Sequence, residues 1–454
     1  MIEVLEKRAP YVGCLAALLG TFLASVVFFP SQPALIGALV VPGIVLSLGI
    51  LLVPILRLLL GSDRLLNSEN FVAAGFLMWL LLDLIQGAYD LHGATDHGIR
   101  MALVSIGVFA ACMWLATALR PLPVPKALLD VANEPLDASV VGRIVPICFI
   151  LGMFNFLYSV NFDVAAAFSY LGAQRWAAPW SRGQLGGWEA FRDQMPYFGY
   201  VLPSLAAVLI AKRGLLKFQS LLAIAMSIVM LLFLSQGGGR RIIGVTVGSA
   251  LLVWVLLNTG ARVKNVIVVG VGAIALAWAA QLMLNVRTSG YEDFLRRGSG
   301  YDYLHIDDNF LRLAQIIDLV PQQRPYVYSQ QVLFTLVRPV PRVLWPNKPV
   351  NPGFDLAAEV GLKGVSLSSS ILGEWYISWG WWAIVVGGFL HGIPAKTVNS
   401  LPRSGNPIVY GLATMVLVAG MRSMLDLVIM SYALIAFWVV SRFYARKSPR
   451  YATA

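Results

Sequence analysis

Charged residues are scarce in this 454-residue sequence: Asp, Glu, Lys and Arg make up only 13% of it, whereas 58% is hydrophobic. This composition, with a mean hydropathy of +0.73, excludes an ordinary soluble globular protein. Apolar runs of about 20 residues, long enough to cross about 30 Å of hydrocarbon, recur along the chain. The runs are continuous rather than alternating, which excludes a transmembrane β-barrel. The sequence therefore predicts an all-α, polytopic membrane protein.

Cysteine and histidine are rare too. Cys14, Cys112 and Cys148 are isolated within predicted spans, so neither a disulfide framework nor a thiolate metal site is indicated. The spacing of His305, Asp307 and Asp308 matches no defined ligand motif, and we expect neither a metal nor another cofactor. The charged start MIEVLEKRAP leads into an apolar run without a small-residue cleavage site, so no cleavable signal peptide is expected.

Hydropathy predicts about twelve membrane-spanning helices. We expect them at residues 11–29, 34–58, 71–90, 101–119, 141–160, 196–211, 217–235, 242–259, 265–285, 371–393, 406–420 and 423–441. Basic residues gather in alternate connections, from Lys7 and Arg8 to Arg442 and Arg450, which predicts a cytoplasmic location for both termini. Contact with anionic lipid explains the net charge of +11 without a nucleic acid partner.

Two long segments, 161–195 and 286–370, then face outward. A connection of about 85 residues is far longer than an ordinary loop and normally carries function. We therefore divide the chain into an N-terminal bundle (1–285), a large outward loop (286–370) and C-terminal spans with a basic tail (371–454). Within the loop, FLRLAQIIDLV has the spacing of an amphipathic helix. Its predicted apolar stripe consists of Phe310, Leu311, Leu313, Ile316, Ile317 and Val320.

The stretch SQGGGRRIIG, at 235–244, places glycines and two arginines between apolar runs. Arg240 and Arg241 are expected at the outward N-terminus of a helix, against the positive-inside tendency. Backbone N–H groups exposed by Gly237–Gly239 and the helix dipole favour an anion there, and guanidinium suits phosphate oxygens. A glycine hinge with arginines that reach to the interface would explain the same stretch without a ligand.

A second basic stretch, LVRPVPRVLWPNKP at 336–349, carries Arg338, Arg342 and Lys348 on a backbone stiffened by prolines. Trp345 is a candidate for stacking on a sugar or for anchoring at the interface. An ordinary basic loop at the membrane rim is the simpler alternative. Two outward basic sites predict a substrate with two phosphates or one pyrophosphate.

Three charges lie within or beside predicted spans: Asp83, Arg422 and Asp426. Arg422 is expected near the outward end of the last span, where it could join the phosphate site. An Arg422–Asp426 pair at i, i+4 would explain both residues without a ligand.

A transferase at an outward face needs a donor with its own leaving group, because that side holds no ATP or nucleotide sugars. A polyprenyl diphosphate fits, and arginines would stabilise the departing diphosphate. Glycosyl transfer also needs a base. Glu374 is a candidate because a carboxylate inside a span is costly and usually functional, although it could equally be the buried partner of an arginine. The other outward candidates are His305, Asp307, Asp308, Glu292 and Asp293.

Several of these runs resemble the oligosaccharide repeat-unit polymerases of bacterial surface polysaccharides, the Wzy type. In that family a proline-arginine-x-x-tryptophan-proline-x-lysine-proline stretch, here 341–349, precedes a glycine-glutamate-aromatic motif, here Gly373-Glu374-Trp375. An earlier glycine-arginine motif is similar to Gly239-Arg240-Arg241. The likeness covers roughly residues 235–393.

The resemblance implies a GT-C-like glycosyltransferase of the bacterial inner membrane with a periplasmic active site. It would transfer a glycan from undecaprenyl diphosphate to a lipid-linked repeat unit, with inversion at the anomeric carbon and without a metal. A chain-length regulator and a flippase would be its protein partners. It further implies that Arg240, Arg342 and Arg338 recognise the diphosphate with support from Arg241. Glu374 or an acid of 305–308 would be the base.

Two alternatives remain. An O-antigen ligase, which moves glycan to lipid A core, shares nearly every feature above. A transporter or flippase of anionic substrates would be expected to carry charges near the membrane midplane. Here the charged residues proposed for the site are expected at one membrane face, which favours chemistry at the membrane–water interface.

Overall fold

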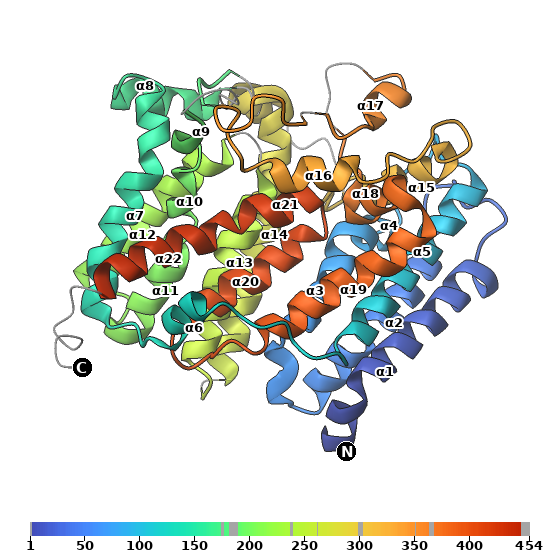
Figure 1. Ribbon diagram of the computed structural model, residues 1–454, viewed down its shortest axis with the longest axis horizontal. Coiled ribbons are helices and arrows are strands. Elements are labelled where there is room, and N and C mark those ends of the chain that lie inside the picture. The colour runs from blue at the N-terminus through green and yellow to red at the C-terminus, as the bar shows by residue number, and fades with distance from the viewer. Residues whose placement is uncertain are drawn as a thin grey trace.

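In the computed structural model the described residues are 2–173, 177–180, 189–236, 239–260, 262–297, 303–349, 351–362 and 367–445. The regular elements in these ranges are all helical (Figure 1). Within them, ten helical segments are long and apolar enough to cross a membrane, which confirms the prediction of an all-α polytopic membrane protein. These segments are Ile2–Val27, Val40–Leu59, Ser68–Ile85, Asp96–Ala116, Ala138–Tyr158, Ala190–Arg213, Phe218–Ser235, Arg240–Leu257, Lys264–Met283 and Met424–Phe443.

The bundle has two hydrophobic cores side by side. The first is built mainly from α1 (Ile2–Phe22), η1 (Leu23–Val27), α2 (Val40–Leu59), α3 (Ser68–Phe76), η3 (Leu77–Leu81), α4 (Leu82–Ile85), α5 (Asp96–Ala116), α15 (Asn309–Leu319), α18 (Ser370–Trp379) and α19 (Trp381–Val398). The short helix η2 (Asp63–Leu66), between α2 and α3, contributes no buried residue to this core. The second is built mainly from α6 (Lys126–Asn133), α7 (Ala138–Tyr158), α10 (Pro196–Gly199), α11 (Leu202–Arg213), α12 (Phe218–Ser235), α13 (Arg240–Leu257), α20 (Pro407–Gly420), α21 (Met424–Met430) and α22 (Tyr432–Ala445). The remaining elements are α8 (Val164–Ser169), η4 (Tyr170–Gly172), α9 (Glu189–Arg192), α14 (Arg262–Arg297), α16 (Gln330–Val337) and α17 (Leu356–Glu359).

The two predicted outward segments lie at the same end of the bundle. Figure 1 shows α8 and α9 together with α15, α16 and α17 at this end, which we call the loop end. The first turn of α1 and the short helix α6 lie at the opposite end (Figure 1). The ninth apolar segment ends at Met283, and α14 continues as a helix to Arg297, into the predicted large loop.

Two predicted spans differ in the structure. The run 371–393 is broken at Gly380, whose backbone (φ 63°, ψ −138°) suits glycine and few other residues. A Cβ at this position would lie 2.6 Å from the hydroxyl oxygen of Tyr326, so contact with the loop also requires glycine. The run 406–420 becomes α20, whose 14 residues span only about 21 Å. Neither is among the ten long apolar segments.

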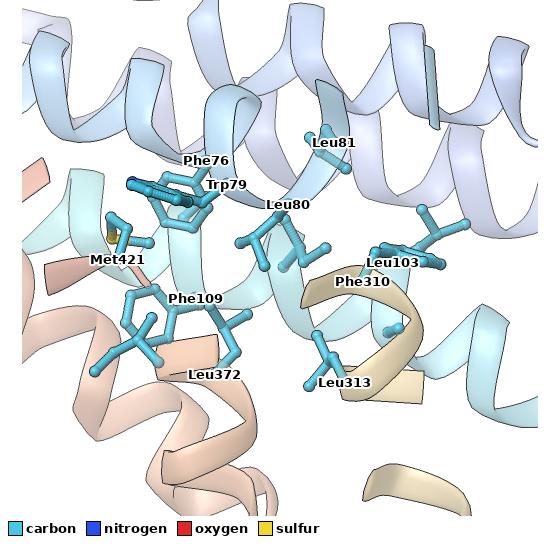
Figure 2. Close-up of a cluster of buried hydrophobic side chains, with 14 of the residues drawn as sticks. Phe76, Trp79, Leu80, Leu81, Leu103, Phe109, Phe310, Leu313, Leu372 and Met421 are labelled. Carbon is cyan, nitrogen blue, oxygen red and sulfur yellow. The ribbon is translucent and has the colours of Figure 1, made fainter. Parts of the chain in front are cut away.

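Helix α15 is inserted into the first core. The predicted helix is confirmed, and all six residues of its apolar stripe are buried. Figure 2 shows Phe310 and Leu313 among side chains of the bundle, including Leu80, Leu103 and Leu372. Full burial of each such side chain is worth about 1.5–3 kcal/mol, so α15 is held firmly and fixes the position of the residues that precede it.

Helices α19 and α5 pack closely through a glycine-x-x-x-glycine pair. A Cβ at Gly388 would lie 2.6 Å from both the carbonyl oxygen of Phe109 and the Cβ of Cys112. At Gly392 it would lie 2.6 Å from the Cβ of Ala116. Small residues at this spacing let two membrane helices approach backbone to backbone.

We expect Gly388→Leu to push α19 away from α5 and to destabilise the protein by about 1–3 kcal/mol, the usual cost of overpacking. Gly270→Leu is the matched control, because a Cβ at Gly270 on α14 would have no neighbour within 4 Å. Thermal unfolding in detergent micelles measures both variants. Equal melting temperatures for the two would contradict the close packing.

Candidate functional site

The segment before α15 is fastened to the end of the third span. The side-chain amide of Gln86 accepts a hydrogen bond from the N–H of Leu304 and donates one to its carbonyl oxygen, both at 2.9 Å. Asp83 Oδ1 accepts from the N–H of Ile306 at 3.1 Å. This span contains the π-helical turn η3, a feature that often marks functional sites. Residues 304–306 therefore have a fixed backbone position.

His305 lies between two carboxylates. Its Nδ1 is 3.2 Å from Asp83 Oδ2, and its Nε2 is 3.9 Å from Asp308 Oδ1. His305 and Asp83 are buried, whereas the Asp308 side chain is 39% exposed. Asp308 also contacts the guanidinium of Arg312 at 3.3 Å and accepts a hydrogen bond from the hydroxyl of Tyr89 at 3.4 Å. The contacts thus run from the interior, through the imidazole, to a partly exposed carboxylate.

A second set of ion pairs joins the same segment to α13 and α21. Arg422 Nε is 3.0 Å from Asp307 Oδ2, and Arg422 Nη1 is 3.0 Å from Asp426 Oδ2. Asp426 is fully buried, and its other oxygen is 2.8 Å from Arg241 Nη1. We call Asp307, Asp426, Arg241 and Arg422 the Asp426 network. The predicted Arg422–Asp426 pair is confirmed.

Arg240 donates a hydrogen bond to the carbonyl oxygen of His305 at 2.9 Å. Burial acts to raise the pKa of Asp307, but the positive charges of Arg422 and Arg240 outweigh it and hold that pKa below its ordinary value. Both arginines of the glycine-rich stretch therefore contact protein groups. Gly239 caps α13, whereas Gly237 and Gly238 lie outside the described residues, so the phosphate cradle stays a prediction.

Glu374 caps the beginning of α21. Its Oε2 accepts from the N–H of Met424 at 2.6 Å, and its Oε1 accepts from the hydroxyl of Ser423 at 3.1 Å. These bonds satisfy donors at a helix N-terminus, where negative charge is also favoured. Glu374 therefore hydrogen-bonds to Ser423 and Met424, which directly follow Arg422, rather than to an arginine side chain. Glu374 lies on α18, a ten-residue helix outside the ten long apolar segments.

The residues after α16 form a compact basic turn. The buried ammonium of Lys348 donates to the carbonyl oxygens of Arg338 at 3.2 Å and Val340 at 2.5 Å. Burial lowers the pKa of Lys348, and the nearby positive charges of Arg338 and Arg342 lower it further. We call Arg338, Arg342 and Lys348 the Arg338 cluster.

The Arg338 cluster differs from the Asp426 network in its charge balance. The ion pairs among the described residues include no member of this cluster. In the same part of the chain, Arg342 Nε is buried without a hydrogen-bond partner. A buried unpaired donor is costly, so this turn is suited to an anionic ligand.

The two groups of charges are neighbours. Helix α16 packs on α21, the helix that carries Asp426. Tyr197, on α10, lies close enough to both Arg241 and Arg338 to interact with their charges. The centroid of its ring is 5.1 Å from that of Tyr432, on α22. Trp345, the predicted stacking residue, is 39% exposed in the basic turn.

Among the described residues, no three His, Cys, Asp or Glu side chains are placed to hold a metal ion. The side chains of Glu292 and Asp293 lie outside the described residues. Sequence reasoning noted Asp83, a carboxylate in an apolar run, without assigning its role. It missed Tyr89 and Ser423, because nothing local in the sequence indicates their distant partners. It also missed Arg312, although the i, i+4 spacing to Asp308 is a local signal for that pair.

A comparison with known proteins finds no matching family model, no similar curated protein and no similar solved structure.

Glu374 gives a prediction for the pH dependence of stability. Burial raises its pKa from the ordinary 4.5 to about 7, against the hydrogen bonds from Met424 and Ser423. Between these values the folded protein holds a proton that the unfolded chain has released, so stability falls as the pH rises through this window. We expect the melting temperature of the wild type, relative to Glu374→Gln, to fall between about pH 5 and about pH 8. A difference that stays constant with pH would remove Glu374 as the titrating group.

Proposed function

We propose that this chain is a polymerase of bacterial surface polysaccharide in the inner membrane. It transfers a glycan from undecaprenyl diphosphate to a lipid-linked oligosaccharide repeat unit. The loop end would be periplasmic and both termini cytoplasmic, as the basic residues of the connections predict. The observation that carries the proposal is the Arg338 cluster, which forms no ion pair with any described residue and contains the buried, unpartnered Nε of Arg342.

Arg338 and Arg342 are our candidates for binding the diphosphate. A guanidinium presents a planar set of donors that matches phosphate oxygens, and Arg342 Nε is buried without a partner. Lys348 closes the turn through backbone carbonyls and so positions the two arginines. As the bond to the sugar breaks, negative charge grows on the departing diphosphate, and fixed positive charges lower the energy of that state.

His305 is our candidate for the base. The charge of the Asp83 carboxylate, 3.2 Å from Nδ1, would favour a proton on that nitrogen and leave the lone pair on Nε2, the nitrogen nearer the partly exposed Asp308. In the proposed step, Nε2 takes the proton of the acceptor hydroxyl while the hydroxyl oxygen bonds to the anomeric carbon of the donor glycan. The bond from that carbon to the diphosphate oxygen breaks, and the electron pair leaves with the polyprenyl diphosphate. Asp308 would help to orient the acceptor.

Arg241, Arg422 and Glu374 receive a different role from the one first expected. The charges of both arginines are met by Asp426 and Asp307, and Glu374 holds the turn after Arg422. We propose that these residues hold the segment 304–308 against α21. The charge available to a ligand then resides in the Arg338 cluster.

The test is a reconstituted reaction with purified protein and a lipid-linked repeat unit. We expect a ladder of products that differ by one repeat unit. Wild-type protein that leaves the repeat unit unchanged, or that makes a single adduct only when lipid A core is supplied, would contradict polymerisation.

Arg342→Ala should slow ladder formation about 100- to 1,000-fold, the usual effect of removing one donor to a developing charge. Arg342→Lys should recover only part of the rate, because an ammonium lacks the forked geometry. Arg324→Ala is the matched control: Arg324 lies on the same loop but pairs with Glu359 at 2.7 Å. Wild-type rates for Arg342→Ala would discard the diphosphate site.

His305→Gln should reduce the rate about 10²- to 10⁴-fold, the usual contribution of a general base. The variant should still bind the lipid-linked substrate, because the Arg338 cluster is untouched. The exposed residue His97 supplies the control variant His97→Gln, which should keep the wild-type rate. Normal ladders from His305→Gln would exclude the imidazole as the base.

A further inference from the structure

Helix α16 has an apolar face that is exposed in the part of the chain that the structure describes. Its buried residues, which include Gln331 and Thr335, lie on the side that packs on α18 and α21. On the other side Leu333 is 42% and Leu336 62% exposed. The turn that follows exposes further large apolar side chains, and these are Val343, Leu344 and Trp345. Water-facing surfaces rarely gather apolar side chains in this way.

Neighbouring elements set the height of this segment relative to the membrane. Helix α19 packs along α5, one of the ten long apolar segments, whose 21 residues measure about 32 Å, close to the thickness of the hydrocarbon layer. Trp379 at the end of α18, and Trp381 and Trp382 at the start of α19, lie exposed at the loop end, as aromatic residues do at the membrane–water boundary. The N–H of Val327 donates to the carbonyl oxygen of Ile377 at 2.9 Å. The chain therefore enters α16 at the level of this boundary.

Orientation and charge agree with this height. Figure 1 shows α16 lying across the direction of the spans rather than along it. Arg338 and Arg342 follow it directly, without an ion-pair partner among the described residues. Helices that lie in the plane of a membrane combine an exposed apolar face with cations that meet anionic headgroups.

We infer that α16 and its basic turn are seated in the lipid headgroup layer at the loop end. Leu333, Leu336 and Trp345 reach toward the acyl chains, and the two arginines lie at the depth of the lipid phosphates. The occupant of this surface is the bilayer itself. The inference rests on exposure, height and charge, and it holds whether or not the protein transfers glycans.

The experiment places an environment-sensitive fluorophore on a single cysteine at Leu336, in a background without the three native cysteines. The protein is reconstituted in nanodiscs of phosphatidylethanolamine and phosphatidylglycerol. We expect blue-shifted emission, quenching by a spin label near the top of the acyl chains, and protection from aqueous iodide. A fluorophore at Gln322, exposed on the connection between α15 and α16, is the control and should respond to iodide only.

Two outcomes would overturn the inference. Iodide quenching at Leu336 as strong as at Gln322 would place α16 in water. Protection from both quenchers would mean that another protein, or a second copy of this chain, covers the surface. Lipid quenching should persist in Arg342→Ala, so the result is separable from the test of glycan transfer.

Discussion

The organisation of the loop end depends on one buried carboxylate. Asp426 is fully buried and divides its two oxygens between Arg241, on α13, and Arg422, in the turn between α20 and α21. Arg422 also pairs with Asp307, so the large loop, α13 and the last span meet at one point. Removing one member of a buried pair costs about 3–5 kcal/mol, because the remaining charge stays without compensation. The network holds Asp307, two residues from His305, whose own backbone is held by Gln86 and Asp83.

This interaction separates two kinds of arginine that look alike in the sequence. Arg240 and Arg241 were expected to bind phosphate because they follow glycines at a helix N-terminus, but both contact groups of the protein. In the basic turn after α16, neither Arg338 nor Arg342 forms an ion pair with any described residue. An arginine whose charge the fold leaves unpaired can bind an anion without first giving up an ion pair. Neutralisation depends on which carboxylates arrive from distant parts of the chain.

The sequence predicted those features that depend on local periodicity. The apolar stripe of α15 follows from helical spacing, and Arg422 and Asp426 are one turn apart. The pairing of Asp307 with Arg422 joins residues 115 positions apart, which no local pattern records. The break at Gly380 was missed for a similar reason: glycine is common in membrane spans, and here its necessity comes from Tyr326, a residue of the loop.

The π-helical turn η3 makes the site sensitive to the length of the third span. A π-helical turn holds one more residue than the α-helical hydrogen-bonding pattern, so the residues after it are rotated by about 100° relative to an uninterrupted helix. Asp83 and Gln86, which contact the segment 304–306, both follow this turn. A related chain that lost a single residue between Leu77 and Leu81 would direct both side chains elsewhere while remaining equally hydrophobic. The contacts of Asp83 and Gln86 therefore constrain the number of residues in the third span as well as its composition.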